Sequence, residues 1–146
     1  MSNPERLLVA ATLGLIASLL VVGVVSSTLV RHLIQLAPAY VLLYGTFTHR
    51  AWVRAGAVPV FVFWLFIVIA IWCFLLGIAH IVSGTYTTTE RVMTGTIALS
   101  SVAGLVAIAQ SRASASWVSR FGGFVLLAAL QWGAFWLSIQ PAFSHR

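Results

Sequence analysis

Four histidines are the side chains of this sequence best suited to hold a cofactor: His32, His49, His80 and His145. A haem with two protein ligands needs them at similar depth on facing helices. His32 follows one long apolar run and His80 lies near the end of another, so these two are candidates for contact with a haem or pigment, together with Trp64 and Trp72. We favour the simpler interpretation that each histidine lies at the membrane interface and bonds to water or backbone. The sequence requires no cofactor.

The acidic side chains argue against catalysis. Glu5 and Glu90 are the two acids of the chain, and neither lies inside an apolar run. A proton relay or a carboxylate transport site places an acid within a span, and two separated acids favour neither paired-carboxylate catalysis nor a divalent metal. Ser83 and His80 lie three residues apart without a nucleophile signature, and the chain has no phosphate-binding or dinucleotide motif. We therefore expect no catalytic residue, no metal and no enzyme, and Cys73, the single cysteine, excludes an intrachain disulfide.

The basic side chains indicate contact with lipid. The net charge of +6 comes from eight arginines, with no lysine. They occur one or two at a time between apolar runs, whereas a nucleic-acid site has a basic face or groove, so we expect no nucleic acid. Arginines beside spans mark the cytoplasmic side and attract anionic head groups. The candidates for contact with lipid or a partner are Arg31, Arg50, Arg54, Arg112 and Arg120.

Aromatic side chains form a second group of candidate contacts. The run from Val58 to Ile81 carries six phenylalanines and tryptophans, which divide at 100° per residue into two opposite faces. We expect one face to pack on its own bundle and the other to meet a helix, lipid or pigment. From this run, Phe61 is a candidate for contact with lipid or a partner. From the last apolar run, the candidates are Trp132 and Trp136.

The elements that position these residues are membrane helices. Hydrophobic residues make up 61% of the 146 residues and charged residues 7%, a composition for which lipid must be the main solvent. In lipid, a single segment satisfies its backbone hydrogen bonds only as a helix. The sequence predicts an all-α polytopic integral membrane helix bundle, one transmembrane domain over 1–146, with long spans at about 7–30, 58–81, 92–110 and 121–140. The first run is too long for a signal-peptide core and is expected to be retained.

A short apolar segment at about 33–47 leaves the topology open. It lacks the polar face of an interfacial helix, so it is either an embedded re-entrant segment or a fifth crossing that starts near Pro38. Counting arginines divides them five to three in both versions. Both versions place loops 49–57 and 111–120 in the cytoplasm. The membrane we expect is a bacterial-type inner membrane.

Small residues indicate how the spans pack and what the protein does. Gly14 and Ser18 form one small pair, and a stripe of small residues runs along the third span at Ser100, Gly104, Ala107 and Ser111. With no charge inside the spans, we expect a non-catalytic accessory or assembly subunit of a larger complex, energy-transducing or pigment-bearing, with membrane lipids and other transmembrane subunits as partners. The alternative is a small homo-oligomeric transporter, channel or lipid-binding protein, with a path lined by Thr94, Ser101 or Gln131.

Overall fold

The fold is all-α, as the sequence predicts. The computed structural model describes residues 1–111 and 115–144, and this part of the chain contains no strand. Its helices are α1 (Asn3–Val25), α2 (Leu29–Gln35), α3 (Ala37–Phe47), α4 (Val53–Leu75), α5 (Thr88–Gln110), α6 (Trp117–Ser138) and α7 (Pro141–Ser144).

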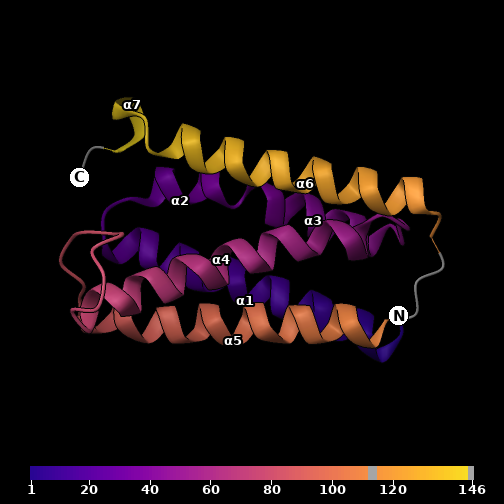
Figure 1. The fold of residues 1–146 in the computed structure, drawn as a ribbon, viewed down its shortest axis with the longest axis horizontal. Coiled ribbons are helices and arrows are strands. Elements are labelled where there is room, and N and C mark those ends of the chain that lie inside the picture. The colour runs from indigo at the N-terminus through magenta and orange to yellow at the C-terminus, as the bar shows by residue number, and fades with distance from the viewer. Residues whose placement is uncertain (112–114, 145–146) are drawn as a thin grey trace.

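Four of these helices are long and apolar enough to cross a membrane. They are α1, α4, α5 and α6, each 22 or 23 residues long. At about 1.5 Å per residue each reaches about 33 Å, which exceeds the hydrocarbon thickness of about 30 Å. The four run alongside one another in Figure 1. The protein is therefore an integral membrane protein.

The short helices α2 and α3 together carry the chain back through the bundle. α2 begins where α1 ends, and α3 ends where α4 begins, at the opposite end of the molecule (Figure 1). The two are divided at Leu36, and Pro38 stands in the first turn of α3, where its missing N–H is tolerated. The chain thus makes five passes between the two ends, which is the path of the five-crossing version.

This path sorts the arginines by end. The basic end, formed by the N-terminus and the α3–α4 and α5–α6 connections, carries Arg6, Arg50, Arg54 and Arg120. The distal end, formed by the α1–α2 turn, the α4–α5 loop and α7, carries Arg31 and Arg91. Arg112 and Arg146 lie outside the described residues. Loops 49–57 and 111–120 therefore share one end in the described part, as expected.

The helix boundaries differ from the predicted ones. α1 ends at Val25 rather than at residue 30, because Ser27 turns the chain with φ 55°. α4 covers 53–75 rather than 58–81, and Gly77 leaves it with φ 71°, a value that glycine adopts readily. The other two long helices each start four residues earlier than predicted, at Thr88 and Trp117. Side-chain caps fix these starts: Thr87 Oγ1 accepts from the backbone N–H of Glu90, and Ser116 Oγ accepts from that of Ser119.

The predicted small-residue contacts join α1 to α5 and α5 to α4. A Cβ at Gly14 would lie 2.6 Å from Ser100 Oγ, and one at Gly104 would overlap the ring of Phe61. Ser18, Ser100 and Ala107 are all buried. Close approach of backbones through small residues is the usual way in which membrane helices associate, and the predicted packing face of the third span is confirmed.

The aromatic helix α4 packs within the molecule on both of its predicted faces. Phe61 is fully buried against α5, and Phe63, from the opposite face, lies 5.8 Å from Trp132 and 5.3 Å from Phe135 of α6, ring centre to ring centre. Phe66, three residues from Phe63 on the same face, is 54% exposed. The face that we expected to remain for an external surface is therefore divided between α6 and the exterior. Phe61 lies inside the molecule and does not contact lipid or a partner.

The small residues on one side of α6 do not pack against the bundle. Gly122, Ala129 and Gly133 are all exposed, and no atom lies within 4 Å of a Cβ built at either glycine. The glycine that approaches the bundle is Gly123, which lies against Trp52. The helix is rotated this way because Leu127, Gln131 and Ala134 face inward with Gly123.

Candidate functional site

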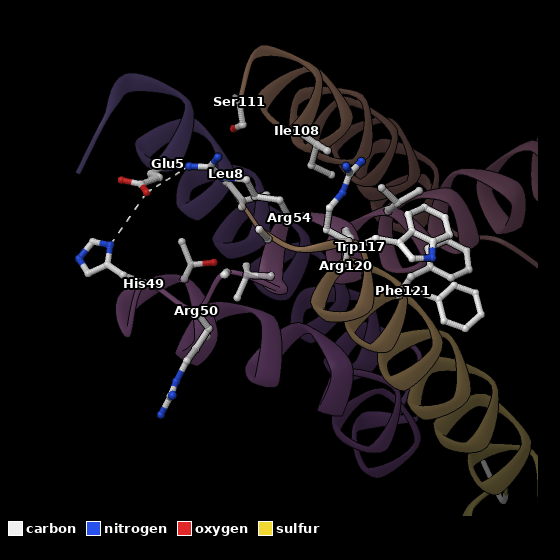
Figure 2. A pocket seen from close by; sticks show the side chains of 18 residues that line it. Glu5, Leu8, His49, Arg50, Arg54, Ile108, Ser111, Trp117, Arg120 and Phe121 are labelled. Carbon is white, nitrogen blue, oxygen red and sulfur yellow. Dashed lines mark ion pairs between the residues drawn. The ribbon is translucent and has the colours of Figure 1, made fainter. Parts of the chain in front are cut away.

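A cleft of about 620 Å³ opens at the basic end of the molecule and brings together side chains from five helices and their connections. Figure 2 shows Glu5 and Leu8 of α1 on one side and Trp117, Arg120 and Phe121 of α6 on the other. Arg54, from the first turn of α4, stands between them, and Arg50, from the α3–α4 turn, lies at the margin. We call this space the basic cleft.

The charge of the basic cleft is positive. Three arginines line it in the described residues, against one acid, Glu5. Arg54 and Arg120 extend from different helices into the cleft, whereas Arg50 points away from both (Figure 2). A guanidinium presents several N–H donors in a rigid fork that matches a phosphate or carboxylate. The cleft can therefore hold an anion between α4 and α6.

Glu5 pairs with two basic side chains of the cleft. Its Oε1 lies 3.7 Å from an Arg54 nitrogen and 3.9 Å from His49 Nδ1, as the dashed lines in Figure 2 mark. Its Oε2 accepts the backbone N–H of Ser2 at 2.9 Å, so the carboxylate also caps the start of α1. Because the pair is partly exposed, its contribution to stability is about 0–1 kcal/mol. Glu5 thus competes with a bound anion for Arg54.

The α6 wall of the cleft is aromatic and apolar. Trp117 and Phe121 stack at 6.0 Å with an angle of 25° between their planes. Trp117 is 73% exposed, as is common for a tryptophan at a membrane border. Phe124, Val58 and Ile108 continue the lining. A cleft with cations inside and apolar side chains along its wall matches an amphiphile with an anionic head.

The structure gathers some of the predicted contact residues and separates others. Arg50, Arg54 and Arg120 share the basic cleft, and Arg112 lies outside the described residues. Arg31 lies at the distal end, where it lines two smaller cavities. Trp132 and Trp136 are each 64% exposed on α6 and face outward.

The candidate cofactor residues are not brought together. His32 and Trp64 line one distal cavity, but Trp72 and His80 do not. Trp72 stands in the last turn of α4 and donates from Nε1 to Thr94 Oγ1 at 3.1 Å. His80 lies in the α4–α5 loop, where its ring meets Phe74 at 5.8 Å. Within residues 1–111 and 115–144, no three His, Cys, Asp or Glu side chains are grouped to hold a metal ion.

Sequence reasoning missed the roles of two side chains in the cleft. The sequence identifies Glu5 only as an acid near the N-terminus and His49 only as one of four histidines. A signal for Glu5 exists, since a serine followed three residues later by glutamate is the pattern of a capping box. For His49 no such signal exists, because its pairing depends on the return of the chain through α2 and α3.

The buried polar residues of the predicted path do not form one. Ser101 and Gln131 are 0% and 1% exposed, and neither lines the basic cleft or the two distal cavities. Thr94 lines one distal cavity. The transporter or channel alternative gains no support from these positions.

Comparison with known proteins leaves the site to be interpreted from its own geometry. No family model, no curated protein and no solved structure matches this chain.

Proposed function

We propose that this protein is a non-catalytic membrane protein that binds the phosphate-bearing head group of an anionic lipid in the basic cleft. The observation that carries the proposal is that Arg54 and Arg120, from two different membrane helices, line one cleft of about 620 Å³ with an aromatic wall. Anionic lipids concentrate in the cytoplasmic leaflet, where juxtamembrane arginines gain about 1 kcal/mol each.

The basic end is accordingly proposed to face the cytoplasm, in a bacterial-type inner membrane. This orientation rests on the positive-inside rule, since the basic end carries four arginines in the described residues and the distal end two. It places the head-group cleft in the leaflet that is rich in anionic lipid.

Native mass spectrometry of the protein in mild detergent tests the proposal. Phosphatidylglycerol and cardiolipin should form adducts that survive at collision energies that remove phosphatidylcholine. Combining Arg54→Gln with Arg120→Gln should weaken the anionic adducts by at least roughly tenfold, because each charge-assisted hydrogen bond contributes about 1.5–3 kcal/mol.

Arg91→Gln is the matched control, since Arg91 is exposed at the distal end and lines none of the three cavities. It removes one positive charge, as does each single variant, Arg54→Gln or Arg120→Gln, and should leave the adducts unchanged while each of those weakens them. Equal loss in Arg91→Gln and in the two single variants would reduce the effect to net charge and contradict a built head-group site.

A second candidate function, an accessory or assembly subunit of a larger complex, is favoured by the outer face of α6. Ala129 and Gly133 form a small pair there, beside the exposed Trp132 and Trp136. Purification from native membranes should recover other transmembrane subunits that are lost from Gly133→Leu. A protein that stays monomeric and co-purifies with nothing would remove this candidate.

A further inference from the structure

A second cavity, of about 430 Å³, lies at the distal end, far from the basic cleft. It is enclosed by the end of α1, by α2, by the second half of α4 and by the first turns of α5, with residues 82–86 of the loop across it. Of the two cavities at this end, it is the one lined by His32 and Trp64, and we call it the distal cavity. Its lining changes from apolar and aromatic on the inner side to polar near the loop.

The inner side of the distal cavity carries an indole without a hydrogen-bond acceptor. Trp64 is 4% exposed, and its Nε1 has no partner in the described residues. Trp72, on the same helix, donates its own Nε1–H to Thr94. Because a buried N–H without an acceptor is costly, a ligand oxygen that displaces the atoms covering Trp64 Nε1 would be stabilised. Phe135 and Ile97 line the cavity nearby.

The outer side supplies an acceptor at a defined atom. His32 Nδ1 lies 3.0 Å from the backbone carbonyl oxygen of Thr28. A carbonyl oxygen only accepts, so Nδ1 carries the hydrogen, and Nε2 of the neutral ring is left as an acceptor. A ligand hydroxyl can donate to it.

The charges of the distal cavity balance. Among the described residues that line it, Arg31 is the one arginine and Glu90 the one acid. Glu90 is 7% exposed, and its Oε2 accepts from the backbone N–H and the hydroxyl of Thr87 at 2.7 and 2.8 Å. Unlike the basic cleft, this cavity has no excess of one sign, and its charge favours a neutral ligand.

We propose that the distal cavity binds a lipid-soluble quinol. Its flat ring matches the aromatic inner lining, and one ring oxygen accepts from Trp64 Nε1–H. A hydroxyl on the ring donates to His32 Nε2. A quinone has the acceptor but not the donor, so the site is expected to prefer the reduced form. The proposal concerns binding alone and is independent of the head-group cleft.

Photolabelling of the full chain in phosphatidylcholine liposomes tests this inference. An azidoquinone reduced to its quinol should label peptides around 26–35, 64–71 and 82–97, and excess unlabelled ubiquinol-type quinol should compete in the wild-type protein. Quinone of the same chain length should compete less well. Labelling spread over the outer face of α6 and not displaced by quinol would overturn the proposal, as would displacement by a fatty acid but not by quinol.

Two variants assign the contacts, with unfolding temperatures measured beside each. Trp64→Phe keeps an aromatic ring and removes the N–H, so quinol should compete roughly tenfold less well. In Trp136→Phe, an exposed position that lines none of the three cavities, quinol should compete as in the wild type. His32→Leu should remove the preference for quinol over quinone. Unchanged competition by Trp64→Phe would contradict the assigned donor.

Discussion

At the scale of single residues, Glu5 lowers the net positive charge of the basic cleft. It is the one acid among the described residues that line the cleft, and it lies within 4 Å of both Arg54 and His49. A carboxylate in this position neutralises part of the field that an anionic head group would feel. Its effect is electrostatic rather than structural, because the pair is partly open to solvent.

Glu5→Gln should therefore tighten anionic lipid binding. The substitution removes a competitor for Arg54, and a pair worth up to about 1 kcal/mol corresponds to up to roughly fivefold in affinity. Titration with phosphatidylglycerol, followed by native mass spectrometry, measures the change. Glu5→Asp keeps the charge and is the control; weaker binding by Glu5→Gln would show that Glu5 supports the site instead of opposing it.

A second residue-scale prediction concerns the start of α5. Thr87 accepts the N–H of Glu90 and gives Glu90 a hydrogen bond in return, so Thr87→Ala should lower the stability by about 0.5–2 kcal/mol. Thr89→Ala, two residues on and exposed, should change it by less than about 0.5 kcal/mol. Thermal unfolding in detergent compares the two, and equal effects would contradict a specific cap.

At the scale of helices, glycine determines which surfaces of α5 can approach a neighbour. Gly104 faces the ring of Phe61, whereas Gly95 of the same helix has no atom within 4 Å of a built Cβ. The two positions share a helix and differ only in what covers them. Substitutions at these two positions therefore distinguish the role of a glycine in packing from its effect on helix propensity.

Gly104→Ala should destabilise the protein by about 1–3 kcal/mol, because the added methyl group forces a fully buried phenylalanine to move. Gly95→Ala should be neutral or stabilising, by up to about 1 kcal/mol, since alanine is the better helix former. Unfolding temperatures in the same detergent test the contrast. Similar losses in both variants would place the cost in the backbone rather than in the α4–α5 contact.

The helices also show how far the sequence could be interpreted. Four spans follow from the lengths of the apolar runs, and the arginines of the basic cleft stand out because charge is rare in this chain. The C-terminal end of α4 could not be predicted, since Leu76, Ile78 and Ile81 continue the apolar run outside the helix. The distal cavity could not be predicted either, because the lack of an acceptor for Trp64 depends on what packs around it.

At the scale of the whole molecule, the return of the chain through α2 and α3 decides which ends meet. It places the N-terminus at the same end as the α3–α4 and α5–α6 connections. Without it, Glu5 would lie across the membrane from Arg54, and His32 across from Glu90. Both proposed sites therefore depend on the fifth pass.

Labelling of single cysteines from outside the membrane tests this topology. In a Cys73→Ser background, Asn3→Cys and Ala51→Cys should be protected together, and Ser83→Cys should react. In a four-crossing chain, Asn3→Cys would instead react together with Ser83→Cys. The position of residue 3 thus separates the two topologies, while residues 51 and 83 serve as fixed references.

The break at Leu36 has a consequence for how the protein is made. Gln35, next to the break, is 4% exposed and donates from Nε2 to Ser138 Oγ at 2.9 Å, across 103 residues of chain. During synthesis this amide enters the membrane long before α6 exists to accept from it. The Gln35–Ser138 hydrogen bond can therefore form only after the last long helix is inserted, so this contact between α2 and α6 is a late step of biogenesis.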